Sequence, residues 1–129
     1  MPTHNLYFRS ATTLWFLVSC LLLASCVQKP VKVSEAERKA QDSIVSSISN
    51  LDSLVKLQKR MEHEGNLLGS IVAYRELGKR VRNDSQFDDA LRFHSEGLTQ
   101  AEALGDTLEV VQALNNIGTD YRRMGVLDL

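Results

Sequence analysis

The side chains that could carry chemistry in this chain are few and far apart. Two cysteines, Cys20 and Cys26, occur near the start of the 129-residue sequence, and the three histidines are His4, His63 and His94. The sequence contains no HExxH pair, no glycine-rich phosphate loop and no Gly-x-Ser-x-Gly turn. In those motifs metal ligands, phosphate-binding amides or a serine nucleophile are held together. We therefore expect no catalytic residue, no metal and no cofactor, and the chain is predicted not to be an enzyme.

The remaining polar candidates have simpler explanations. We expect His63 to lie in solvent near the end of a helix, and His94 to pack against a neighbouring helix. Asp88 and Asp89 stand together where a helix is predicted to begin, and carboxylates stabilise the first turn of a helix through its dipole. We interpret this pair as a helix-start feature rather than as an acid and a base.

Cys26 stands at the end of the only long apolar run. From Leu14 to Ala24 the sequence reads LWFLVSCLLLA, which is too short for a membrane span of about 20 residues. Its length and its position behind the weakly positive start around Arg9 match the hydrophobic core of a secretory signal. The sequence therefore predicts a signal peptide over residues 1–25.

The residues around the end of this segment are Leu23-Ala24-Ser25-Cys26, and they resemble the bacterial lipobox. The resemblance implies cleavage directly before Cys26 and attachment of a diacylglyceryl group to its thiol. More than one acyl chain then holds the protein stably at a membrane, on the periplasmic or cell-surface side. Two alternatives stay open: an uncleaved signal anchor, and an accidental cysteine near a conventional cleavage site.

The charge of the chain argues against nucleic-acid binding. Lys and Arg total 15 and Asp and Glu total 16, for a net charge of −1. Without residues 1–25, which contain Arg9 alone among charged residues, 14 basic and 16 acidic residues remain, a net charge of −2. Binding of phosphates needs clustered Lys and Arg. The one basic cluster, over residues 79–82, would spread over different faces of a helix, so we expect no nucleic-acid partner for this segment.

The part that follows Cys26 is predicted to begin as a tether and to continue as a helix. Residues 26–33 include Pro30 and have no helical period, so we expect an extended, mobile linker. Ser34 and Glu37 have the spacing of a capping box. One amphipathic helix is predicted over residues 34–64, with an apolar stripe. The stripe consists of Ala36, Ala40, Ile44, Ile48, Leu51, Val55 and Met61.

Three further helices are predicted, over residues 67–82, 88–104 and 107–124. Gly65 and Asn66 indicate a turn, Gly105 suits the end of a helix, and Asp106 with Glu109 has the spacing of a second capping box. Short loops between successive helices favour antiparallel hairpins, and no alternation typical of strands occurs. The fold class is therefore predicted to be all-α. The apolar positions expected to face the core are Leu68, Ile71, Val72, Leu77 and Val81, then Ala90, Leu91, Leu98, Ala101 and Leu104, then Val110, Leu114, Ile117, Tyr121 and Met124.

The last two thirds of this helical region contain an internal repeat. Residues 74–78, YRELG, recur as residues 114–118, LNNIG, displaced by 40 positions. Together with the small residues Ala90 and Gly97 and the Leu-Gly-Asp linker at 104–106, they resemble the tetratricopeptide repeat. The resemblance implies an α-solenoid, with a first unit over 66–105 and a partial second over 106–129. An array incomplete at its C-terminus would belong to a longer protein and would leave apolar side chains uncovered around Leu114. A generic helical bundle is the alternative.

Tetratricopeptide arrays hold extended peptides in a groove lined by the first helix of each unit, so the resemblance implies a protein or peptide partner here. Carried over by position, the candidate groove residues are Arg75, Lys79, Arg82, Asn115, Asn116, Thr119 and Arg122. Amides pair with peptide backbones, and Arg and Lys with carboxylates. These residues could equally be ordinary exposed polar side chains. The predicted function is a lipid-anchored extracytoplasmic scaffold. The alternative is the sensory region of a longer membrane-linked signalling protein, such as a histidine kinase or a transcriptional regulator.

Overall fold

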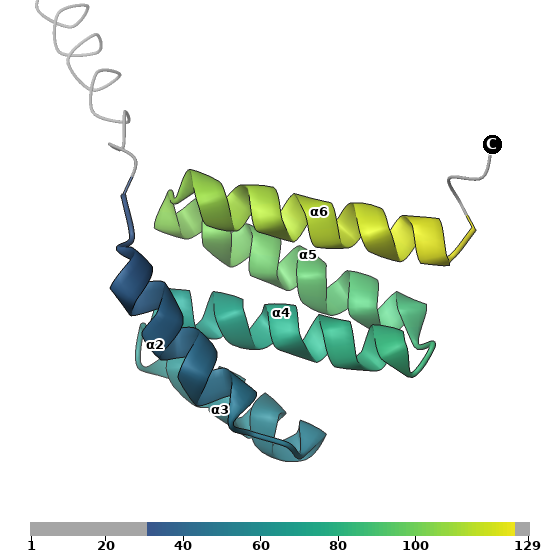
Figure 1. The fold of residues 1–129 in the computed structure, drawn as a ribbon, viewed down its shortest axis with the longest axis horizontal. Coiled ribbons are helices and arrows are strands. Elements are labelled where there is room, and N and C mark those ends of the chain that lie inside the picture. Colours follow the sequence, from purple (N-terminus) through teal and green to yellow (C-terminus); the bar gives the residue numbers. More distant parts are fainter. Residues whose placement is uncertain (1–30, 126–129) are drawn as a thin grey trace, which may run out of the picture.

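The computed structural model describes residues 31–125, and these form an all-helical fold of five helices (Figure 1). The helices are α2 (Glu35–Ser46), α3 (Leu51–His63), α4 (Leu67–Asn83), α5 (Phe87–Leu104) and α6 (Thr107–Arg123). No strand occurs among these residues, as predicted. The helices α4, α5 and α6 run antiparallel to their neighbours in the chain, and α2 and α3 lie on the opposite side of α4 from α5 (Figure 1).

The helix ends follow the local sequence. Ser34 caps α2, and its side chain and that of Glu37 form the predicted capping box. Asp106 caps α6 by accepting from the backbone N–H groups of Leu108 and Glu109. The Glu109 side chain turns away from this cap, so the second capping box is only half formed. Gly105 ends α5 in the left-handed conformation at φ 74°, where a residue without a Cβ costs little.

The single helix predicted over 34–64 is wrong, because the chain breaks into α2 and α3 between Ser47 and Asn50. Serine hydroxyls compete for backbone groups at this point: Ser47 donates to the carbonyl of Ile44 at 2.7 Å. Asn50 then caps the next helix by accepting from the N–H of Ser53 at 3.0 Å. Serine and asparagine favour helix starts over helix interiors for this reason.

The break also changes which side chains of this region are buried. Of the predicted stripe, Met61 alone is buried, Ile48 and Val55 are half-buried, and the others are exposed. The residues that face the interior instead are Arg38 and Val45 of α2 and Leu54, Leu57, Gln58 and Met61 of α3. The predicted stripe assumed one continuous helix. Because α2 and α3 are separate helices with different axes, the helical spacing does not continue from one to the other.

The core lies around α4, which packs against the four other helices. Its predicted apolar side is confirmed: Leu68 is half-buried and the other positions are buried. The buried cluster consists of Val45, Leu54, Leu57, Met61, Val72, Ala73 and Leu77. In α5 the small residues Ala90, Gly97 and Ala101 are buried, which allows close approach to both neighbouring helices.

The helix α6 departs from the predicted pattern. Its buried residues are Glu109, Ala113 and Asp120, whereas Leu114 and Tyr121, expected in the core, are exposed by 51% and 38%. Two of the three inward positions are therefore carboxylates, which a burial prediction from hydrophobicity assigns to solvent.

The tether is described only from residue 31 onward, and Cys26 and the signal segment lie outside the described residues. Residues 31–34 are non-helical, as expected. Val33 is not free, however: it is half-buried, and its N–H donates to Oδ2 of Asp106 at 3.0 Å. Among residues 31–125, no helix is both long and apolar enough to cross a membrane.

Candidate peptide-binding face

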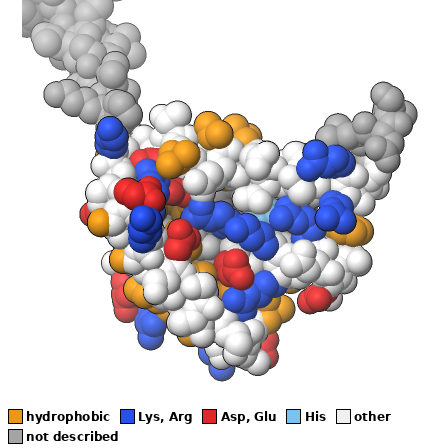
Figure 2. All heavy atoms as spheres, in the orientation of Figure 1, with side chains coloured by type: hydrophobic (Ala, Val, Ile, Leu, Met, Phe, Trp, Pro, Cys, Tyr) orange, Lys and Arg blue, Asp and Glu red, His pale blue; other side chains and the backbone are white. Residues whose placement is uncertain are grey.

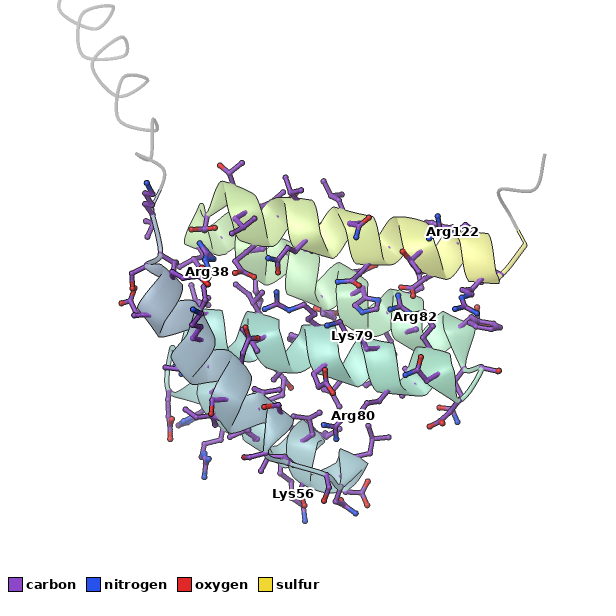
Figure 3. The ribbon with its side chains drawn as sticks, in the orientation of Figure 1. Arg38, Lys56, Lys79, Arg80, Arg82 and Arg122 are labelled. Carbon is purple, nitrogen blue, oxygen red and sulfur yellow. The ribbon has the colours of Figure 1, made fainter. Side chains whose placement is uncertain are left out.

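The predicted groove residues come from α4 and α6, two helices that contact each other through the pairs Arg82–Asp120 and Arg75–Glu109. Figure 2 shows Lys and Arg side chains gathered in a band across the middle of the side in view, and Figure 3 places Lys79, Arg82 and Arg122 along it. We define the α4–α6 face by the residues Arg75, Lys79, Arg82, Asn115, Asn116, Thr119 and Arg122. Figure 3 also shows Lys56 on α3, well away from this face.

The members of the α4–α6 face differ in exposure. Lys79, Asn115 and Arg122 are exposed and can meet a partner directly. The guanidinium groups of Arg75 and Arg82 are largely covered, with side-chain exposures of 16% and 14%. Asn116 and Thr119 are half-buried. The predicted spread of residues 79–82 over different faces is confirmed, since Val81 is buried and Arg80 turns toward the carbonyl of Ser49 at 3.0 Å.

A buried carboxylate of α6 holds Arg82 in place. Nη1 of Arg82 lies 3.0 Å from Oδ1 of Asp120, whose side chain is fully buried. The other oxygen of this carboxylate lies 2.5 Å from Nδ1 of His94 on α5. Nε2 of the same imidazole lies 3.3 Å from the carbonyl of Arg75. His94 packs against a neighbouring helix as predicted, and the Asp120 cluster joins α4, α5 and α6 at one point.

A second buried carboxylate, Glu109, performs the same task for Arg75. Its Oε1 lies 2.5 Å from Nη1 of Arg38 on α2, and its Oε2 lies 3.5 Å from Nη2 of Arg75. Oε2 is buried and accepts no hydrogen bond. The positive charge of Arg75 therefore offsets the cost of burying this oxygen. Arg75 also reaches toward Asp42 of α2 at 3.7 Å. The Glu109 cluster therefore ties α2 to α4 and α6.

Asp106 extends the Glu109 cluster to the start of the described chain. Its Oδ2 lies 2.7 Å from Nη2 of Arg38 and accepts from the N–H of Val33. Burial alone raises the pKa of Asp106, but the backbone N–H groups of Val33 and Glu109 and the Arg38 charge outweigh burial and hold that pKa below its ordinary value. The carboxylate form is favoured because its oxygens have donors and a cation around them.

Four of these residues escaped prediction: Arg38, Asp106 as an ion-pair partner, Glu109 and Asp120. Only Asp120 has a local signal, because it is a charged residue three positions after Ile117 and four before Met124 in the helix. Arg38 has polar residues at these spacings, and Asp106 precedes its helix. No local signal can pair Arg38 with Glu109, because the two residues are separated by 71 positions.

Two hollows are lined in part by residues of the α4–α6 face. A cavity of about 10 Å³ between α4, α5 and α6 is lined by Arg75, His94, Glu109 and Asn116, with room for about one water molecule. A more open hollow of about 210 Å³ between α2 and α4 is lined by polar and apolar side chains. Its lining is Asp42, Ser43, Val45, Ser46, Val72, Arg75, Glu76 and Lys79. This second hollow is large enough for one side chain of a partner.

The other candidates for chemistry do not assemble into a site. His63 is exposed at the end of α3, and Asp88 and Asp89 are exposed in the first turn of α5, as predicted for each. Residues 31–125 contain no group of three metal-ligating side chains. The arrangement on the α4–α6 face offers N–H donors and positive charge at fixed positions, which is the chemistry of recognition.

Comparison with known proteins finds no match: no protein-family model matches the chain, and neither does a curated protein or a solved structure. The likeness to the tetratricopeptide repeat and to the lipobox therefore stays a prediction from the residues quoted above.

Proposed function

We propose that this chain is a lipid-anchored, extracytoplasmic protein of the tetratricopeptide type that binds a protein or peptide partner at the α4–α6 face. The observation that carries the proposal is the placement of Arg75 and Arg82 by buried carboxylates. Each arginine has five N–H donors, and Arg82 directs only Nη1 to Asp120 and, at 3.5 Å, to the carbonyl of Asn116. Pre-organised donors bind a partner with a smaller loss of conformational freedom.

The internal repeat supports the assignment to this type of fold. Residues 74–78 of α4 and 114–118 of α6 are the corresponding segments of the repeat, and both helices pack against α5 and contact each other through Arg82 and Asp120. In such an array the first helices of successive units form one surface, and here that surface carries the candidate residues of both copies. The exposed amide of Asn115 can pair with a peptide backbone, and Lys79 and Arg122 can pair with carboxylates.

The proposed anchor is compatible with an accessible binding face. Cys26 lies seven positions before Val33, and a chain of this length spans at most about 25 Å when fully extended. Val33 is attached near the start of α6 through Asp106. The lipid would therefore hold the α5–α6 turn near the membrane and leave the central part of the α4–α6 face open. Mass spectrometry of the mature N-terminus tests the anchor, and an unmodified Cys26 in membrane-extracted protein contradicts it.

Peptide binding is tested with a peptide selected from a random displayed library against the mature chain. A triple variant, Lys79→Ala with Asn115→Ala and Arg122→Ala, removes exposed groups and leaves the buried ion pairs intact. Because hydrogen bonds to charged groups are worth about 1.5–3 kcal/mol each, we expect affinity to fall by more than about tenfold. Lys56→Ala is the matched control, since Lys56 is exposed on α3. Equal affinities of the triple variant and the control would remove the assignment of the face.

A further inference from the structure

The hollow between α2 and α4 shares one wall with the α4–α6 face. Arg75 and Lys79 line the hollow, and both are members of that face. The volume of the hollow is about 210 Å³, and its apolar lining is Val45 and Val72, whose exposures are 1% and 2%. A side chain that enters the hollow therefore meets apolar groups and cations together.

The guanidinium group of Arg75 stands between two carboxylates. Its Nη2 lies 3.5 Å from Oε2 of Glu109 and 3.7 Å from Oδ1 of Asp42. Both distances exceed the usual length of a hydrogen bond, and within residues 31–125 the Arg75 side chain forms ion pairs but no hydrogen bond. Arg75 is held by charge, so its N–H donors remain available to a closer acceptor.

The two carboxylates differ in how readily they can be displaced. The Glu109 side chain is exposed by 1%, so water cannot take the place of its arginine partners, and a buried charge without a partner is costly. The Asp42 side chain is exposed by 59%, and water solvates it when it turns away. Exposed ion pairs of this kind contribute little to stability. An acceptor from a partner can therefore replace Asp42 but not Glu109.

The charge of the hollow favours an anionic occupant once Asp42 has turned away. Glu76, which also lines the hollow, is paired with Arg80 at 2.9 Å. Lys79 is exposed and forms no ion pair within the described part of the chain. One carboxylate is enough to balance the charge of Lys79 while it accepts from Arg75, and charge-assisted hydrogen bonds of this kind are the stronger ones.

We propose that this hollow is a subsite for one glutamate side chain of the partner, and that Asp42 competes with the glutamate carboxylate for Arg75. The incoming carboxylate would accept from Arg75 and pair with Lys79. Its two methylene groups would pack on the buried valines of the hollow. This inference rests on the proposed function, because it names a partner group for the same face.

The probe is capped glutamate, N-acetylglutamate N-methylamide, titrated into the isotopically labelled mature chain. We expect backbone chemical-shift changes at residues that line the hollow, namely Asp42, Ser43, Ser46 and Lys79. Asp42→Asn and, separately, Asp42→Ala should each tighten binding by about two- to fivefold, because each removes an exposed competing charge. The alanine variant excludes a new hydrogen bond from the asparagine amide. Glu102→Gln is the matched control, since Glu102 is exposed on α5 and does not line the hollow, and it should leave affinity unchanged.

Four outcomes overturn the inference. Absence of shift changes around the hollow would show that it binds no glutamate, and equal changes with capped glutamine would show that the charge is not recognised. Inorganic phosphate that shifts the same residues at lower concentration would make a free anion the occupant. Unchanged or weaker binding in both Asp42 variants would show that Asp42 does not compete. In each case the proposed function stands if a selected peptide binds at Asn115 and Arg122, so the two failures are distinguishable.

Discussion

At the scale of single residues, α6 buries both of its carboxylates and exposes four of its large apolar side chains. Asp120 and Glu109 are exposed by 0% and 1%, whereas Val111 is exposed by 55%. Burial of a charge is costly unless a partner compensates for it. Here each carboxylate faces an arginine of another helix: Asp120 faces Arg82 of α4, and Glu109 faces Arg38 of α2 and Arg75 of α4. The buried charges thus fix how the helices lie against one another.

Replacement of Asp120 by Asn should destabilise the fold. The change leaves Arg82 and His94 without their anionic partner, and loss of one member of a buried pair costs about 3–5 kcal/mol. Urea unfolding of the two proteins measures the difference. The control is Asp89→Asn, because Asp89 lies in an exposed pair with Arg92, and such pairs contribute about 0–1 kcal/mol. A loss at Asp120 no larger than at Asp89 would contradict the role of this cluster.

The lowered pKa of Asp106 predicts a pH dependence of stability. Because the folded protein favours the carboxylate, this group contributes stability above its ordinary pKa of 3.8, and the contribution is lost as pH falls through the lower folded value. Asp106→Asn keeps a capping oxygen but carries no charge. The difference in free energy of unfolding between the wild type and this variant should therefore be largest near neutral pH and should shrink on acidification. A difference that does not vary with pH would contradict the assignment.

At the scale of helices, the two in-phase glycines should respond in opposite ways to the same substitution. Gly78→Ala forces a methyl group against the His94 ring, and overpacking of this kind costs about 1–3 kcal/mol. Gly118→Ala places the methyl group in open space and should stabilise α6 by up to about 1 kcal/mol. Thermal or urea unfolding compares the pair. Equal effects of the two substitutions would show that α5 does not pack on Gly78 as described.

Local sequence predicted the helices α4, α5 and α6 and most of their caps, because their ends carry Gly, Asn or Asp at positions with a defined physical role. It missed the break at residues 47–50, where the Ser-rich sequence preceding Asn50 contains no Gly or Pro. The prediction of the α4–α6 face rested on position in the repeat, and in the structure Lys79 and Arg122 lie on the side of the molecule shown in Figure 3. The buried partners could not be predicted, since each pairs residues far apart in the sequence.

At the scale of the whole molecule, the first described residues are connected to the last described helix. Arg38 and Val33 contact Asp106 and Glu109 at the start of α6, while α4 separates α2 and α3 from α5 (Figure 1). This contact joins the segment that follows the proposed lipid anchor to the last described helix. In the α4–α6 face, the buried carboxylates of Glu109 and Asp120 hold the guanidinium groups of Arg75 and Arg82 in place.

The central claim is that the α4–α6 face binds a partner, and one measurement tests it most directly. A peptide selected against the mature chain is titrated into labelled protein, and backbone chemical shifts locate where it binds. We predict that the largest changes occur at Lys79, Asn115 and Arg122, with little change at Lys56 of α3. Changes gathered around Lys56, with none at the α4–α6 face, would contradict the account.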